Sequence, residues 1–231
     1  MRWPWIATLL GVLGGLGVAG HEWWRGALDA PLPEVAIQSD PFASQRPLTL
    51  TVLGTSLTAG STWPEQLAQD LALCTSRPVR LERIATGGQT SAWGLRQIER
   101  VVATSPDILL IGFTINDADL RRQISPSESR RLHREMLVQL SAALPQTDLH
   151  LMRLNRAYGL RAALRVRLVT YEAALPDLAQ ETGVGFFDLR PMWTAYLSEA
   201  GPGASMPDGL HPTDAVARAV NVAALRDRLC P

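Results

Sequence analysis

Short apolar segments alternate along the chain with longer segments in which apolar residues recur at helical spacing. The first apolar segment, Leu48 to Leu53, interleaves Leu with Thr and Val, a composition typical of a buried strand. The segment from Asp107 to Phe113 is almost continuously apolar, as a central strand of a parallel sheet should be. Similar features indicate three more strands. The five predicted strands span residues 48–53, 79–85, 107–113, 148–154 and 185–189.

The segments between these strands have the spacing of amphipathic helices. In the segment that begins at Ser91, for example, Leu95, Ile98 and Val102 fall on or near one face of a helix. Pro176 should kink or divide one of the helices, because proline has no backbone N–H and its ring crowds the preceding turn. The predicted helices span residues 64–73, 91–102, 125–144, 163–182 and 212–229.

Strands that alternate with helices predict an α/β fold in which a parallel sheet lies between two layers of helices. Five strands in this pattern fit the flavodoxin-like strand order 2-1-3-4-5. Right-handed crossovers would then place the first and last helices on one face of the sheet and the middle helices on the other. Residues 48–231 are therefore predicted to form a three-layer α/β/α sandwich around a five-stranded parallel sheet.

Residues 1–24 differ in character from the rest of the chain. The stretch from Trp3 to Gly20 carries no charge, and pairs of Trp stand at both ends of residues 3–24. As a helix, residues 3–24 would rise about 32 Å, close to the hydrocarbon thickness of a bilayer, and Trp is typical of the membrane interface. We favour a membrane anchor. A signal peptide cleaved at residues 18–20 is the second interpretation, and a buried helix of the soluble domain is the weakest.

The first two interpretations both place the body of the protein in the cell envelope. An anchor would hold it at the inner membrane, facing the periplasm, whereas a cleaved signal peptide would leave it exported. Residues 25–47 contain four prolines and no periodic pattern, and we interpret them as a tether.

Composition excludes several classes of function. The 22 acidic and 22 basic residues balance, so charge gives no general case for a nucleic-acid partner. All 22 basic residues are Arg, which excludes a Walker-type phosphate loop and a Lys nucleophile. No cluster of Cys and His has the spacing of a metal site. We therefore expect neither a metal nor a cofactor.

Four short segments carry the candidate chemistry. Residues 54–58, 87–90 and 115–117 follow the first three predicted strands, and residues 208–212 open the last predicted helix. Because the carboxyl ends of parallel strands lie along one edge of a sheet, these segments should converge in one crevice. Ser56, in the first segment, is a candidate nucleophile at a turn whose backbone N–H groups can receive a developing anion.

The requirements of acyl transfer assign a role to a residue in each segment. The hydroxyl of Ser56 needs a neighbouring base, and His211 is the only histidine in a loop next to another candidate group. Asp208, three residues earlier, could hold the imidazole and stabilise its charged form. A tetrahedral intermediate also needs hydrogen-bond donors. The backbone N–H groups of Ser56 and Gly88 and the side-chain amide of Asn116 could supply them.

In this order, the four segments resemble the conserved blocks of the SGNH (GDSL-type) hydrolases, a superfamily of esterases, lipases, thioesterases and carbohydrate deacetylases. The resemblance extends over about residues 48–229. It implies a nucleophile, two further members of a triad and two oxyanion donors, namely Ser56, Asp208, His211, Gly88 and Asn116. Thr55 stands where the family usually has Asp, and Thr114 where it usually has Gly. Both positions neighbour the site, but neither change removes a catalytic atom.

We therefore predict a serine esterase that acts on a small acyl ester in the cell envelope, for example an O-acetyl group on a glycan. The resemblance implies the reaction class, whereas the substrate is inferred from the predicted location. Two alternatives stay open. An acyltransferase would use the same triad with a sugar hydroxyl in place of water, and a catalytically silent, membrane-tethered binding module would have lost the reaction.

Other polar residues have simpler interpretations. His133 and His150 fall within a predicted helix and a predicted strand, and we interpret both as structural. Arg121 and Arg122 follow the third segment; they belong either to a solvated face, which we favour, or to a contact with an anionic substrate.

The two cysteines, Cys74 and Cys230, are predicted to form a disulfide. Cys74 ends the first helix and Cys230 the last, and the strand order places those helices on the same face of the sheet. Their ends should meet at the edge opposite the active site. A disulfide can persist outside the reducing cytoplasm. The alternative is two unpaired cysteines.

Overall fold

The computed structural model describes residues 26–36 and 46–230. The chain divides into two compact units, residues 1–30 and residues 31–231. In the described part of the first unit, Ala30 N donates to the Gly26 carbonyl oxygen at 2.9 Å and closes a helical turn. The predicted membrane segment, residues 1–24, lies outside the described residues. Among the helices that are described, none has both the length and the apolar character needed to cross a bilayer.

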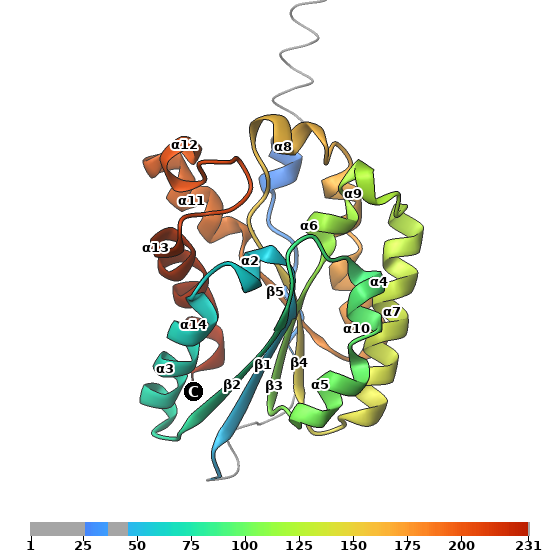
Figure 1. Ribbon diagram of the computed structural model, residues 1–231, viewed down its shortest axis with the longest axis vertical. Coiled ribbons are helices and arrows are strands. Elements are labelled where there is room, and N and C mark those ends of the chain that lie inside the picture. The colour runs from blue at the N-terminus through green and yellow to red at the C-terminus, as the bar shows by residue number, and fades with distance from the viewer. Residues whose placement is uncertain (1–25, 37–45, 231) are drawn as a thin grey trace, which may run out of the picture. The chain divides into compact units, whose positions relative to one another are not determined.

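The second unit is built on a five-stranded sheet (Figure 1). All neighbouring strands pair in parallel, in the order β2-β1-β3-β4-β5. The predicted fold class and strand order are therefore confirmed. The strands are β1 (Leu48–Gly54), β2 (Val79–Ala85), β3 (Ile108–Gly112), β4 (Asp148–Arg153) and β5 (Gly185–Asp188).

Burial explains why the strands could be recognised in the sequence. Every residue of β1 is buried, as are Ile108–Ile111 of β3, so the central strands are apolar on both faces. The edge strand β2 is more exposed, and Ile84 is its one buried residue. At the opposite edge, Val35 pairs antiparallel with Phe186 of β5. Part of the segment predicted as a tether thus lies along this edge of the sheet.

Helices cover both faces of the sheet. The α-helices are α2 (Ser56–Ala59), α3 (Trp63–Thr75), α4 (Ser91–Leu95), α5 (Ile98–Thr104), α6 (Thr114–Asp117), α7 (Pro126–Ala143), α8 (Gly159–Ala163), α9 (Leu168–Glu172), α10 (Leu175–Thr182), α11 (Arg190–Ala200), α12 (Pro202–Ser205), α13 (Asp214–Ala217) and α14 (Ala223–Leu229). A 3₁₀ turn, η1 (Leu120–Arg122), follows α6, and a π turn, η2 (Arg218–Val222), joins α13 to α14.

The helices divide between the two faces as right-handed crossovers require. Helix α3 packs with η2 and α14 on one face, while α4, α5 and α10 pack against α7 on the other (Figure 1). Helix α7 begins as its sequence indicates, with Pro126 in its first turn and the Ser125 hydroxyl accepting a hydrogen bond from Glu128 N at 3.1 Å. A cluster of apolar side chains from β1, β3, β4, α7 and α10 forms the core on that side.

Several helices differ from the predicted ones. The predicted helix 91–102 is divided at residues 96–97. This break lets α4 pack closely on Phe113, since a Cβ on Gly94 would lie 2.5 Å from that ring, while α5 buries Val101. The predicted helix 163–182 is also divided, and Pro176 lies in the first turn of α10.

The helix α11 was not predicted, and neither were the short helices α2, α6 and α12. Pro191 in the first turn of α11 and the buried Trp193 and Leu197 have helical spacing, so the signal is present in the sequence. Trp193 Nε1 donates to Asn221 Oδ1 at 2.8 Å. Asn221 lies in the π turn, which interrupts what was predicted as one regular closing helix.

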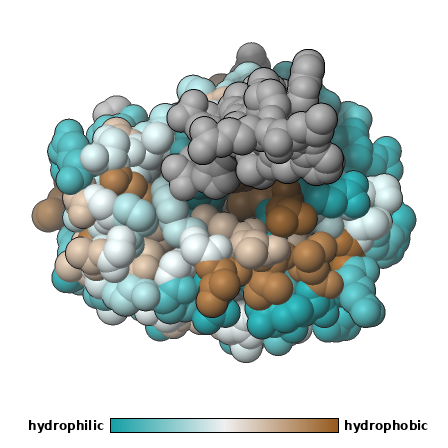
Figure 2. Space-filling view, turned by 90° about the horizontal axis from the view of Figure 1, so that it is seen from above, coloured by the Kyte–Doolittle hydropathy of each residue, from teal (hydrophilic) through white to brown (hydrophobic). Residues whose placement is uncertain are grey.

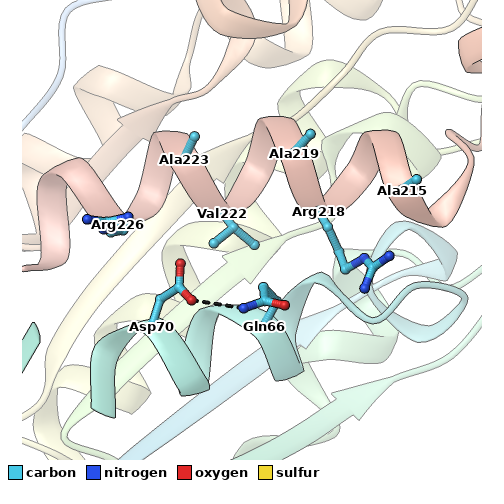
Figure 3. Close-up of a pocket in the computed structure, with 8 residues that line it drawn as sticks. All are labelled: Gln66, Asp70, Ala215, Arg218, Ala219, Val222, Ala223 and Arg226. Atoms are coloured by element: carbon cyan, nitrogen blue, oxygen red, sulfur yellow. Dashed lines mark hydrogen bonds between the residues drawn. The ribbon is translucent and has the colours of Figure 1, made fainter. Parts of the chain in front are cut away.

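A disulfide joins Cys74, in the last turn of α3, to Cys230, just after α14, with the two Cα atoms 5.9 Å apart. Between α3 and the C-terminal helix lies a groove of about 400 Å³ (Figure 3). Gln66 Nε2 donates to Asp70 Oδ1 at 2.9 Å on its α3 side. The groove contains none of the candidate catalytic residues; its lining is Gln66, Asp70, Ala215, Arg218, Ala219, Val222, Ala223 and Arg226.

Candidate active site

The four segments singled out in the sequence meet at the carboxyl edge of the sheet. Ser56 is the first residue of α2, directly after β1. The turn between them is tight, because a Cβ on Gly54 would lie 2.7 Å from Thr58 Oγ1. Thr55 caps α2: its hydroxyl accepts a hydrogen bond from Leu57 N at 3.3 Å. The local sequence therefore fixes the position of Ser56 above the sheet.

The side chains of Ser56, His211 and Asp208 form one chain of hydrogen bonds. Ser56 Oγ lies 2.7 Å from His211 Nε2. On the other side of the ring, His211 Nδ1 lies 2.8 Å from Asp208 Oδ2. About 40% of the His211 side chain is exposed, so the imidazole can be reached by a substrate. A hydroxyl placed against an imidazole that a carboxylate orients is the geometry needed for nucleophilic acyl transfer.

The loop that carries Asp208 is fixed by its own backbone. Asp208 Oδ1 accepts hydrogen bonds from Leu210 N at 2.9 Å and from His211 N at 2.7 Å. Gly209, which directly follows Asp208, has φ +76°. A Cβ on this residue would lie 2.6 Å from the Tyr158 carbonyl oxygen. Only glycine fits this position without strain. The loop is thereby held against the segment that follows β4.

Asp208 stays ionised over the pH range in which enzymes usually work. Burial alone would raise the pKa of this carboxyl group, but hydrogen bonds from the backbone and imidazole of His211 and from Leu210 N outweigh it, and the pKa lies well below its ordinary value. Arg161 Nη2 also lies 3.1 Å from Asp208 Oδ2. The carboxylate is thus available as the acceptor that orients His211.

Groups able to donate to an oxyanion lie around Ser56. A Cβ on Gly87 would lie 3.8 Å from Ser56 Cβ, so the turn after β2 passes directly beside Ser56. Gly88 in this turn has φ +73°. Asn116, on α6 and 4% exposed, donates from Nδ2 to the Gln89 carbonyl oxygen at 2.9 Å. An amide nitrogen carries two N–H groups, so one remains to donate to a bound oxyanion.

Asp117, the residue after Asn116, connects α6 to the start of α4 and to α7. Its carboxylate is fully buried and accepts hydrogen bonds from Ser91 N at 2.8 Å and from the Ser129 hydroxyl at 2.6 Å. His133 Nδ1 lies 2.8 Å from the Ser129 carbonyl oxygen. His150 is buried as well, stacked on Phe187 with ring centroids 4.0 Å apart. Neither histidine reaches the Ser56 site.

Buried ion pairs connect the ends of β4 and β5 and the start of α11 to α9. Glu172 accepts from Arg153 Nε at 3.0 Å and from Arg190 Nη2 at 2.6 Å, and Arg153 Nη1 donates to Asp188 Oδ2 at 3.1 Å. All four side chains are at most 2% exposed. Their spacing in the sequence follows no motif, and they were not predicted.

Arginines near the site were only partly anticipated. Arg121 pairs with Asp119 through two hydrogen bonds of 2.6 and 2.9 Å. Arg165, which is buried, also contacts Asp119, at 2.9 Å. Arg161 and Arg165 were not singled out in the sequence, although residues 149–171 contain five Arg and no acidic residue.

The edge that carries the site also exposes apolar side chains, and Figure 2 shows apolar and hydrophilic groups side by side on it. Leu120, Leu160 and Val166, on segments beside the site, are 54%, 88% and 53% exposed. No group of three or more His, Cys, Asp or Glu side chains within the described part of the chain is arranged to hold a metal ion.

Comparisons with known proteins find a matching sequence family and similar folds. The sequence matches the model of the GDSL-like lipase/acylhydrolase family over residues 52–219, well over half of the chain. A comparison with curated proteins gave no match.

Solved structures with a similar fold include esterases. An acetylxylan esterase from Geobacillus stearothermophilus is similar with a TM-score of 0.68 and 19% identity, over 79% of this chain and 94% of that one. A lipase/acylhydrolase from Enterococcus faecalis has a TM-score of 0.67 and 21% identity, over 78% and 96% of the two chains. At such identities the similarity shows the fold.

Proposed function

The chain belongs to the GDSL-like lipase/acylhydrolase family and is a hydrolase that acts on esters, and we propose that it removes a small acyl group from its substrate through Ser56, His211 and Asp208. The observation that carries this proposal is the unbroken chain of hydrogen bonds, 2.7 Å from Ser56 Oγ to His211 Nε2 and 2.8 Å from His211 Nδ1 to Asp208 Oδ2.

The proposed reaction has two halves. In the first half, His211 takes the proton of the Ser56 hydroxyl while Ser56 Oγ attacks the ester carbonyl carbon. The bond between the carbonyl carbon and the alcohol oxygen then breaks, and His211 gives the proton to the departing alcohol. Water then attacks the acyl-enzyme, with His211 as base, and releases the carboxylic acid and free Ser56. Asp208 accepts from His211 Nδ1 throughout and stabilises the imidazolium that forms twice in each cycle.

In the proposed reaction, the negative charge that develops on the carbonyl oxygen needs hydrogen-bond donors. We assign this role to the backbone N–H groups of Ser56 and Gly88 and to the side-chain amide of Asn116. The burial of Asn116 and its hydrogen bond to Gln89 support the assignment, because a donor that is already held in place needs no reorganisation when the charge forms.

We propose an O-acetyl group on a glycan of the cell envelope as the substrate. The acetylxylan esterase among the similar structures supports this chemical class, and the uncharged residues 3–20 with Trp pairs at both ends of residues 3–24 support the location. Transfer of the acyl group to a sugar hydroxyl would use the same residues, with the sugar in place of water in the second half of the reaction.

Hydrolysis of p-nitrophenyl esters of increasing chain length tests the proposal. We expect activity on the acetate that falls for the butyrate and longer esters, and a loss of about 10⁴-fold or more in Ser56→Ala. Ser198→Ala, which removes an exposed hydroxyl on α11, is the matched control and should keep full activity. A Ser56→Ala protein with more than a tenth of the wild-type turnover would show that Ser56 is not the nucleophile. Inactivity of the wild type on every ester would favour the transferase or the binding module.

A further inference from the structure

Arg122 lies against the turn that is proposed to bind the oxyanion. It is the last residue of η1, the turn that follows Asn116 and α6. A Cβ built on Gly88 would lie 2.7 Å from Arg122 Nη2 and 3.7 Å from Arg122 Cζ. The guanidinium group therefore occupies the space that a side chain at position 88 would fill.

The turn after β2 connects this guanidinium group to the nucleophile. A Cβ on Gly87 would approach Ser56, whereas a Cβ on the next residue, Gly88, would approach Arg122. An ester bound with its carbonyl carbon at Ser56 thus has Arg122 within reach of its remaining part. Topology brings Arg122 near this turn, because α6 and η1 follow β3 along the chain and β3 is two strands from β2 in the sheet.

No described residue of opposite charge pairs with Arg122. The neighbouring Arg121 and Arg165 both pair with Asp119, and Arg161 pairs with Asp208. By contrast, the Arg122 side chain makes no hydrogen bond or ion pair with any residue that the structure describes. Its backbone is fixed nevertheless, since Arg122 N donates to the Asp119 carbonyl oxygen at 2.8 Å. Among the residues that the structure describes, Arg122 is thus an exposed guanidinium group beside Gly88 whose hydrogen-bond donors have no protein acceptor.

We propose that Arg122 binds a carboxylate on the alcohol part of the ester, so that the preferred substrate is an acylated acidic sugar. The inference rests on the proposed function: a small acyl group such as acetyl carries no charge, and the anion must then belong to the alcohol. A guanidinium group suits this role because its parallel N–H donors match the two oxygens of a carboxylate.

A matched pair of acetyl esters separates this role from a direct effect on catalysis. Phenyl acetate is neutral, and 3-acetoxybenzoate carries the same ester with a carboxylate on its alcohol part. We expect the wild type to have a higher kcat/KM for 3-acetoxybenzoate, with a preference that declines as salt is added. In Arg122→Gln, kcat/KM for 3-acetoxybenzoate should fall by about tenfold, as for loss of a charged hydrogen bond, while the value for phenyl acetate stays within about twofold.

The control is Arg121→Gln, which removes the same charge from the adjacent residue, and it should leave the ratio of the two kcat/KM values unchanged. An equal fall for both esters in Arg122→Gln would overturn the proposal and place Arg122 at the ester carbonyl instead. An unchanged ratio in Arg122→Gln, with good activity on phenyl acetate, would overturn it and leave the esterase function standing. A wild type inactive on both esters would contradict the proposed function and this inference together.

Discussion

At the scale of single residues, two departures from the usual family blocks can be understood. Thr55 is 1% exposed, and its hydroxyl caps α2 as the carboxylate of an Asp would. Thr114 is 5% exposed and begins α6, where its carbonyl oxygen accepts from Ala118 N at 3.0 Å. Thr55 and Thr114 thus stand at the N-terminal ends of the short helices that carry Ser56 and Asn116. Their replacement of Asp and Gly therefore leaves the reacting groups in place.

Asp208→Asn should lower kcat by about 10³- to 10⁴-fold while the fold is retained. An amide nitrogen at this position cannot accept the proton of His211 Nδ1, so the imidazole loses the orientation and charge stabilisation that the carboxylate gives it. Turnover of p-nitrophenyl acetate measures the effect, and far-UV circular dichroism checks the fold. Asp227→Asn, at an exposed position on α14, is the control. A fall of less than tenfold would mean that Asp208 does not orient the base.

At the scale of elements, one carboxylate links the segment that carries Ser56 to the segment that carries His211. Asp214, in the first turn of α13, accepts from Thr62 N at 2.6 Å, from the Thr62 hydroxyl at 2.7 Å and from the Ser61 hydroxyl at 2.8 Å. These hydrogen bonds, led by that of Thr62 N, lower the pKa of Asp214 to about 2. Asp214 thereby connects the start of α3 to α13.

Asp214→Asn should destabilise the protein in a pH-dependent way. A carboxyl group whose pKa is lowered on folding stabilises the native state above its unfolded pKa of about 4, and this contribution is lost as the pH falls toward the folded value. The difference in free energy of unfolding between wild type and variant should thus be largest between pH 5 and 7 and shrink below about pH 4. Urea unfolding at several pH values measures it. A difference that does not change with pH would contradict the linkage.

The elements that could be predicted are those defined by local composition. The central strands β1 and β3 are runs of β-branched and aliphatic residues, almost all of them buried, and the cap at Ser125 is a local hydrogen bond. The division of helix 91–102 could not be predicted, because it depends on contact with Phe113, which is distant in sequence. The same holds for the site. Ser56, Asp208 and His211 belong to recognisable segments, whereas the contact of Arg161 with Asp208 spans 47 residues.

In the molecule as a whole, the strand order explains why the two cysteines of the disulfide meet. Order 2-1-3-4-5 brings α3 and α14 to one face, and the bond between Cys74 and Cys230 joins elements 156 residues apart. In the chain-entropy model, closing so long a loop contributes about 5 kcal/mol to stability. Because all the strands are parallel, the opposite edge of the same sheet collects the four catalytic segments. The disulfide therefore stabilises the fold at a distance from the chemistry.

Covalent labelling can show directly whether His211 activates Ser56. Diethyl p-nitrophenyl phosphate reacts with activated serines and stays attached, so peptide mass spectrometry can locate the label. We predict one diethylphosphoryl group per chain, on Ser56, with esterase activity lost in proportion to labelling, and no comparable labelling in His211→Ala. A label on another residue, or full esterase activity in protein labelled at Ser56, would contradict the account.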